Sequence, residues 1–150
     1  MILKKPKFWD YQKISIWPIL LLPLSIIYFL LVSIKKTLST LKIYQNKCPI
    51  ICVGNIYLGG TGKTPLAAEI FKLIKSSGKN PSFIKKYYDY LVDEIRMLSE
   101  IGDTHHAKDR ITAINESLLN GNDVVILDDG FQDFSIKPDF SIVCFNSKQL

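Results

Sequence analysis

The stretch Val53-Gly54-Asn55-Ile56-Tyr57-Leu58-Gly59-Gly60-Thr61-Gly62-Lys63-Thr64-Pro65 decides the fold of this chain. An apolar run at 50–53 leads into it, and an amphipathic helical pattern follows it. A strand, a glycine-rich loop and a helix that opens on Gly-Lys-Thr form the layout of a phosphate-binding P-loop. Glycines let backbone N–H groups converge on phosphate oxygens, and the helix adds its unpaired N–H groups and its positive dipole end.

Two side chains at the end of this loop have defined roles in such a motif. Lys63 would contact the β- and γ-phosphates of a nucleotide, and the Thr64 hydroxyl would ligate magnesium. The usual spacing places a glycine where this chain has Tyr57, so a glycine-rich turn before a surface helix is the alternative. We predict ATP and Mg²⁺ as cofactors. The residues expected to bind the nucleotide are Tyr57, Leu58, Gly59, Gly60, Thr61, Gly62, Lys63 and Thr64.

A long apolar segment precedes the loop. The chain is 47% hydrophobic and 22% charged, and residues 14–34, ISIWPILLLPLSIIYFLLVSI, contain no charged residue. About twenty helical residues match a hydrocarbon core about 30 Å thick. Lys35-Lys36 follows where a signal peptide would have a small-residue cleavage site, so we expect an uncleaved anchor rather than a signal peptide or a buried core helix. Pro18 and Pro23 predict a kink, which leaves a re-entrant insertion open.

Charge and cysteine content limit the partners and the compartment. The formal net charge is +5, and the lysines cluster at the N-terminus and beside the apolar segment, which suits an anionic lipid surface. No aromatic–basic interleaving or zinc-ligand spacing indicates a nucleic-acid module. The three cysteines are an odd number without CxxC spacing, which favours reduced thiols in a domain that faces the cytosol. The oligomeric state is not indicated.

Strands and helices alternate after the loop, which predicts an α/β fold with a P-loop NTPase-like parallel sheet, flanking helices and a preceding membrane helix. The predicted strands are 50–53, 82–84, 124–127 and 140–145. The predicted helices run from Thr64 to a stop at Gly78, from Leu91 to Ile101, and from a cap at Asp109 to Gly121. The expected segments are a basic N-terminus (1–13), the anchor (14–34), a basic connector (35–48) and a P-loop domain (49–150).

Paired acids end the clearest strand. Asp128 and Asp129 directly follow the apolar run 124–127. In P-loop folds a strand near the P-loop strand presents an aspartate to magnesium at its carboxyl end. The predicted metal ligands are therefore Thr64, Asp128 and Asp129. A polar Asp-Asp-Gly turn after a core strand is the alternative.

These motifs together resemble one family. Gly-Asn-(x)3-Gly-Gly-Thr-Gly-Lys-Thr-Pro, followed about 65 residues later by Asp-Asp-Gly-Phe-Gln, is similar to the tetraacyldisaccharide 4'-kinases, the lipid A 4'-kinases. The N-terminal Phe-Trp, the Leu-Leu-Pro-Leu anchor and the lysine-rich exit are also similar. The family's P-loop has the same unusual spacing, so Tyr57 fits the pattern.

The resemblance implies an activity, a location and residue roles. It implies transfer of the ATP γ-phosphoryl group to the 4'-hydroxyl of an acylated disaccharide lipid, tetraacyldisaccharide 1-phosphate, at the cytoplasmic face of the inner membrane. Lys63 would stabilise the phosphates, and Asp93, in an Asp-Glu pair that matches the family's acidic motif, would be the catalytic base. An ordinary exposed acid on a helix is the alternative for Asp93. Arg110 lies where the family has an arginine that could contact substrate phosphate; a solvated arginine is the alternative.

Three departures from the family keep a second function open. The Ser-Arg-Gly-Tyr-Gly segment is reduced to Lys85-Lys86-Tyr87-Tyr88-Asp89, and Asp133 replaces a histidine. The resemblance covers only the N-terminal half of a family member, so we expect a truncated domain without the C-terminal lobe, which supplies a histidine partner for the catalytic acid. The alternative is a non-catalytic, membrane-bound nucleotide-binding remnant. A P-loop ATPase without a lipid acceptor is a third class, which Asp-Asp-Gly-Phe-Gln disfavours.

Overall fold

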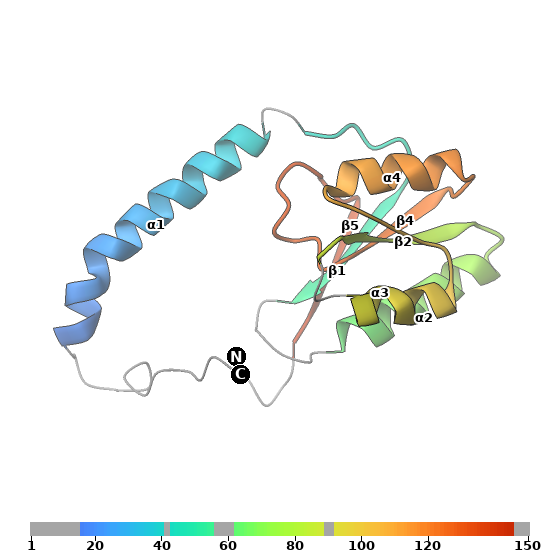
Figure 1. Cartoon of the computed structure of the whole chain (residues 1–150), viewed down its shortest axis with the longest axis horizontal. Helices are drawn as coiled ribbons and strands as arrows, with labels where there is room; N and C mark the ends of the chain where they lie inside the picture. The colour runs from blue at the N-terminus through green and yellow to red at the C-terminus, as the bar shows by residue number, and fades with distance from the viewer. Residues whose placement is uncertain (1–15, 41–42, 56–61, 89–91, 146–150) are drawn as a thin grey trace. The chain divides into compact units, whose positions relative to one another are not determined.

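The computed structural model describes residues 16–40, 43–55, 62–88 and 92–145. They separate into two compact units, an N-terminal helix and an α/β unit that begins beyond it. Figure 1 traces the chain. The helices are α1 (Ile16–Thr40), α2 (Lys63–Ser76), α3 (Val92–Ile101) and α4 (Arg110–Leu119). The strands are β1 (Ile50–Asn55), β2 (Pro81–Lys86), β3 (Thr104–Ala107), β4 (Val124–Asp128) and β5 (Phe140–Cys144).

Helix α1 is a single helix of 25 residues that continues through Pro23. It extends past the predicted end at Ile34 and includes the Lys35-Lys36 pair. Its segment Ile19–Ser39, 21 residues with a mean hydropathy of 2.0, is long and apolar enough to cross a membrane by length and composition alone. Residues 14 and 15 of the predicted anchor lie outside the described residues.

The α/β unit contains a five-stranded sheet in the order β3-β2-β4-β1-β5, and every pairing between neighbouring strands is parallel. This confirms the predicted fold class. Helices α2 and α3 cover one face of the sheet and α4 covers the other (Figure 1). The P-loop strand β1 and the acidic strand β4 are neighbours, with Val53 opposite Asp128. The carboxyl ends of both strands therefore lie at the same edge, which positions the site.

Two apolar clusters form because successive side chains of a strand point to opposite faces. In β4, Val125 and Leu127 pack toward α4, whereas Ile126 packs toward α2 and α3. Strand β4 is buried along its whole length, as expected for a central parallel strand with helices on both faces. Gly78 has a φ of +82°, and it ends the turn that follows α2 at the predicted stop.

The segment before β1, at the start of the α/β unit, is hydrogen-bonded to the segment that precedes β5. Tyr44 pairs with Ile136 in an isolated parallel bridge, and its backbone N–H donates to the Ser135 carbonyl at 2.8 Å. The backbone N–H of Ile50 donates to Asp139 Oδ2 at 2.8 Å. These bonds tie the entry into the P-loop strand to the loop that leaves Asp128-Asp129.

Strand β3 was not predicted from the sequence. Its sequence, Thr-His-His-Ala, has neither an apolar run nor clear alternation, and it is an edge strand that pairs only with β2. Strand β2 is longer than the predicted 82–84 and includes Lys85 as a buried residue. Both differences lie at the β3 edge of the sheet. The longer β2 places the charged Lys85 in the site.

Candidate active site

The first turn of α2 presents an open helix N-terminus at the end of the P-loop. Gly62 is the N-cap with φ +79° and ψ +20°, and no side chain caps the helix there. This left-handed backbone is readily adopted by glycine. Lys63 and Thr64 are the first residues of the helix, and no acidic side chain lies in its first turn. The unpaired N–H groups and the positive dipole end are therefore available to an anion. Tyr57, Leu58, Gly59, Gly60 and Thr61 lie outside the described residues.

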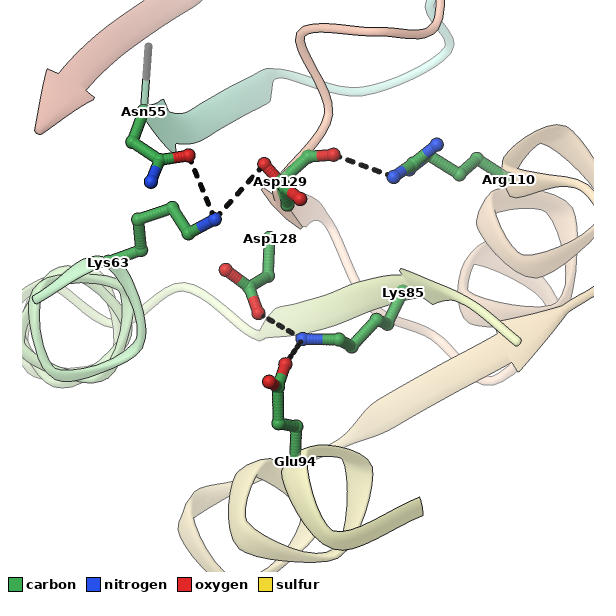
Figure 2. Close-up of polar contacts among 7 residues, drawn as sticks. All are labelled: Asn55, Lys63, Lys85, Glu94, Arg110, Asp128 and Asp129. Atoms are coloured by element: carbon green, nitrogen blue, oxygen red, sulfur yellow. Dashed lines mark hydrogen bonds and ion pairs between the residues drawn. The ribbon is translucent and has the colours of Figure 1, made fainter. Parts of the chain in front are cut away.

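Lys63 links the ends of the two central strands. Its Nζ donates to Asn55 Oδ1 at 3.0 Å and lies 3.2 Å from Asp129 Oδ1 (Figure 2). Asn55 ends β1 and Asp129 directly follows β4, so two residues predicted as separate parts of the site lie together. The Asp129 side chain is 42% exposed, and a pair of this kind contributes at most about 1 kcal/mol to stability. It can therefore be exchanged for a pair with phosphate at little cost.

The backbone of Asp129 is in an uncommon conformation. Its φ is +61°, a left-handed value that aspartate tolerates better than most residues. Its N–H donates to the Val53 carbonyl at 2.8 Å, and its own carbonyl accepts from Arg110 Nη2 at 2.7 Å. These two bonds hold the left-handed turn in place. The turn directs the carboxylate toward Lys63 while the carbonyl faces Arg110 (Figure 2).

Arg110 is a buried residue that supports this loop. Its side chain is 10% exposed, and Nη1 lies 3.5 Å from Asp133 Oδ2. Within the described residues, its Nε is buried without a hydrogen-bond partner. The alternative of a solvated arginine at a helix start is therefore wrong. Asp133 is the acidic partner of this arginine.

A second lysine, Lys85, contacts the other acid of the pair. Its Nζ lies 2.5 Å from Asp128 Oδ2 and 2.5 Å from Glu94 Oε2 (Figure 2). The Lys85 and Asp128 side chains are 5% and 1% exposed. Burial lowers the pKa of Lys85, but the carboxylates of Asp128 and Glu94 raise it by more, so its pKa lies above the ordinary value and the ammonium is charged.

Asp128 has one oxygen that the protein leaves unpaired. Its Oδ1 is buried and has no hydrogen-bond partner among the described residues, whereas Oδ2 contacts Lys85. An unpaired buried carboxylate oxygen is costly unless a donor or a cation satisfies it. This is not the environment of a simple polar turn. In the described part of the chain, no group of three or more His, Cys, Asp and Glu residues forms a metal site.

Asp93 lies in the first turn of α3, and its side chain is exposed. The helix packs through Ile95 and Leu98, which are on its buried face. The residue that contacts the buried charges is its neighbour Glu94. Asp93 therefore lies beside Glu94 in the sequence, and Glu94 makes the contact with Lys85.

Three contacts of the site were missed by the sequence reasoning. Asn55 accepts from the predicted Lys63, and Lys85 donates to the predicted Asp128. Glu94, the neighbour of the predicted Asp93, accepts from Lys85. A signal was present for the first two, because both lie at the carboxyl ends of apolar strands, where ligands bind in parallel sheets. Glu94 is half exposed and has no sequence signal apart from its position beside Asp93.

The fold and the site define a P-loop α/β domain: the P-loop strand and the acidic strand are neighbours, and Lys63 and Asp129 meet at their carboxyl ends. The family model of tetraacyldisaccharide-1-P 4'-kinase matches residues 17–107 and 93–150, and the chain belongs to this family. This confirms the resemblance drawn from the two motifs.

Individual relatives agree with this assignment. The chain is 49% identical over 147 residues to the tetraacyldisaccharide 4'-kinase of Pelagibacter ubique, a match that covers 98% of this chain and 46% of that protein. It is 35% identical over 164 residues to the enzyme of the same name from Rickettsia typhi, covering 97% and 49%. The crystal structure of LpxK from Aquifex aeolicus in complex with ATP has a TM-score of 0.67 and 25% identity, covering 86% and 49%. The chain spans about half the length of the relatives it matches.

Proposed function

We propose that the α/β unit binds ATP at the carboxyl ends of β1 and β4, and that the chain is the nucleotide-binding part of a 4'-kinase for tetraacyldisaccharide 1-phosphate. The observation that carries this proposal is the position of Lys63, between Asn55 at the end of β1 and Asp129 after β4. Ligands of open parallel sheets bind outside the carboxyl ends of the strands. A lysine beside an open helix N-terminus suits the β- and γ-phosphates of a nucleotide.

The proposed phosphate site combines charge with backbone donors. Lys63 would exchange Asp129 for phosphate oxygens, and the N–H groups of the first turn of α2 would donate to them. The loop residues 57–61 would complete the cradle on the evidence of the glycine-rich motif alone. Kinase chemistry of this kind depends on positioning and charge neutralisation rather than on covalent catalysis.

Thr64, Asp128 and Asp129 would hold Mg²⁺. Hydroxyl and carboxylate oxygens are the ligands that this hard cation prefers, and the unpaired, buried Oδ1 of Asp128 is a fitting donor. Bound Mg²⁺ neutralises charge on the phosphates during transfer. Until a nucleotide enters, Lys63 and Lys85 supply the positive charge beside the two aspartates.

Asp93 would accept the proton of the 4'-hydroxyl. Its support is the position of its neighbour: Glu94 contacts Lys85, and Lys85 contacts Asp128. An exposed carboxylate in the first turn of a helix is accessible to a substrate hydroxyl, as a general base must be. The product of the transfer would be lipid IVA.

Helix α1 would anchor the chain in the inner membrane, where its acylated disaccharide substrate lies. The helix has the length and hydropathy of a membrane span. The α/β unit would face the cytoplasm, because ATP is on that side. The Lys35-Lys36 pair, near the end of α1, suits an anionic lipid surface.

Two measurements on the full chain, purified in detergent, test this function. The first is ATP binding by calorimetry, and the second is transfer of a radiolabelled γ-phosphate to the acylated disaccharide 1-phosphate. Lys63→Ala is expected to reduce transfer by about 100-fold or more, the scale of losing one charge-stabilising donor. Lys72→Ala is the matched control, because Lys72 lies on the same helix in an exposed pair with Glu69.

Each result separates the functions that the sequence left open. Transfer that depends on Lys63 but not on Lys72 supports the kinase. ATP binding without transfer would overturn the catalytic claim and favour the nucleotide-binding remnant. ATP hydrolysis that needs no lipid acceptor would instead favour a P-loop ATPase.

A further inference from the structure

Lys85 is a buried cation that connects three elements of the site. It lies near the end of β2, and its ammonium contacts Asp128 in β4 and Glu94 in the first turn of α3, each at 2.5 Å. In Figure 2, Asp128 is drawn between the ammonium groups of Lys63 and Lys85. The family resemblance gives Lys85 no role, because it belongs to a segment that departs from the family's glycine-containing pattern.

The contact between Lys85 and Asp128 fixes the orientation of the Asp128 carboxylate. The Asp128 side chain is 1% exposed, so its carboxylate depends on protein groups rather than on solvent for its partners. With Oδ2 committed to Lys85, the unpaired oxygen is Oδ1, the atom proposed above as a cation ligand. Removing Lys85 would leave the buried charge of Asp128 without this partner, and the carboxylate would lose the contact that sets its orientation.

The contact between Lys85 and Glu94 holds the first turn of α3. Helix α3 is held to the sheet side by Ile95 and Leu98, which lie beyond its first residues. Glu94 comes before both and directly after Asp93, so its bond to Lys85 anchors the turn that carries the proposed base. A displacement of a reacting group by about 1 Å can change a rate strongly, so this anchor matters for catalysis.

We propose that Lys85 is a positioning residue of the phosphoryl-transfer site, whose ammonium orients the Asp128 carboxylate and, through Glu94, holds Asp93 at the carboxyl edge of the sheet. This inference rests on the proposed kinase function. Lys85 acts through its two partners and does not replace Lys63 as a phosphate contact. It therefore affects the transfer step rather than the binding of ATP.

Two variants of the full chain distinguish the contact with Asp128 from the contact with Glu94. Lys85→Met removes the charge and keeps an unbranched apolar chain in the buried site. Glu94→Ala removes only the contact between Lys85 and Glu94, at a residue whose side chain is 50% exposed, so this variant should fold even if the first does not. Lys79→Met is the matched control, since Lys79 is 61% exposed and its acidic partner, Asp123, lies 3.9 Å away.

The expected result is a split between rate and binding. Both variants should lower kcat for transfer, by about tenfold to 100-fold, while the Kd for ATP, measured without Mg²⁺, stays that of the unmodified chain. Circular dichroism at the assay temperature checks that each variant is folded. Folded variants that keep the unmodified kcat would overturn the proposal. A rise in the Kd for ATP that accounts for the whole loss would overturn it as well, because Lys85 would then act in nucleotide binding.

Amide hydrogen exchange provides a readout that does not depend on activity. If Lys85 holds the first turn of α3, both variants should exchange faster at the hydrogen-bonded amides of α3 that follow this turn and normally in α2. If the unmodified chain transfers no phosphate, the kinase function fails, and exchange alone then decides whether Lys85 anchors α3. Unchanged exchange in both variants would overturn the anchoring role.

Discussion

The ring of Phe131 lies against the backbone of Gly54, where an added Cβ would overlap the Cδ2 and Cε2 atoms of the ring. Gly54 belongs to the Gly-Asn pair that opens the P-loop, and Phe131 belongs to Asp-Asp-Gly-Phe-Gln. The two motifs that identify the family are therefore in direct steric contact. The contact explains why a glycine is needed inside a buried strand, where glycine otherwise weakens pairing.

Gly54→Ala should destabilise the chain by about 1–3 kcal/mol, because the added methyl group overlaps the ring and forces the backbone or Phe131 to move. Urea unfolding in detergent, followed by circular dichroism, measures the change. Gly121→Ala is the control: Gly121 has a φ of +84°, but nothing lies within 4 Å of the position that a methyl group would take, so only backbone strain is added there.

A double variant tests whether the ring causes the loss. Phe131→Leu replaces the flat ring by a smaller side chain, so Gly54→Ala should cost less in that background than in the unmodified chain. Neighbouring residues that share a contact are expected to show such coupling. Strictly additive effects would contradict the clash.

Asp129 should respond to substitution according to its backbone conformation. Asparagine also tolerates a left-handed φ, so Asp129→Asn should change the free energy of unfolding by no more than about 1 kcal/mol, the scale of a partly exposed ion pair. A β-branched side chain is strained at the φ of +61°, so Asp129→Val should cost about 1–3 kcal/mol. Urea unfolding compares the two, and equal stabilities would show that the turn is not strained.

The sequence predicts the strands that contain an apolar run better than the strand that has none. Strand β4 reads as an unbroken apolar run because helices cover both of its faces, and the Asp109 cap has a local signal in its own side chain. Strand β3 has no such signal. Its pairing with β2 is decided by tertiary contact rather than by the pattern of Thr-His-His-Ala.

The same limit applies to the site. The motifs predict Lys63 and Asp129 as residues of one site, because parallel strands bring their carboxyl ends to one edge. Motifs do not predict which acid pairs with which lysine. The contacts of Lys85 with Asp128 and Glu94 depend on the order β2-β4-β1 and on the placement of α3, and neither is encoded in a local pattern.

The cysteines should be unreactive in the folded chain. Burial raises the pKa of the Cys52 thiol to about 11, although a backbone hydrogen bond from Gly130 opposes the shift. Burial also raises the pKa of Cys48 and that of Cys144. Thiolate is the reactive form, so a disulfide reagent at about pH 8 should modify the folded chain slowly and all three thiols rapidly in denaturant. Rapid modification of Cys52 in the folded chain would contradict its buried environment.

Asp109 should make the stability of the chain depend on acid. Its carboxylate accepts from the Thr112 N–H at 2.9 Å and from the Thr112 hydroxyl at 2.7 Å, and these bonds lower its pKa below the ordinary value of 3.8. Because the pKa is lower in the folded chain, the stabilisation is fully present above the unfolded pKa and is lost as the pH falls through the folded pKa. At about pH 7, Asp109→Ala should cost about 1 kcal/mol, the usual value of a helix N-cap.

Urea unfolding near neutral pH and again below the folded pKa measures this dependence. The difference between the unmodified chain and Asp109→Ala should shrink in acid, because a protonated carboxyl is a weaker acceptor for the Thr112 N–H. Asp109→Asn is the control, since asparagine caps a helix about as well and does not titrate. Its difference from Asp109→Ala should stay constant with pH. If the unmodified chain behaves like the asparagine variant, the ionised carboxylate of Asp109 does not stabilise α4.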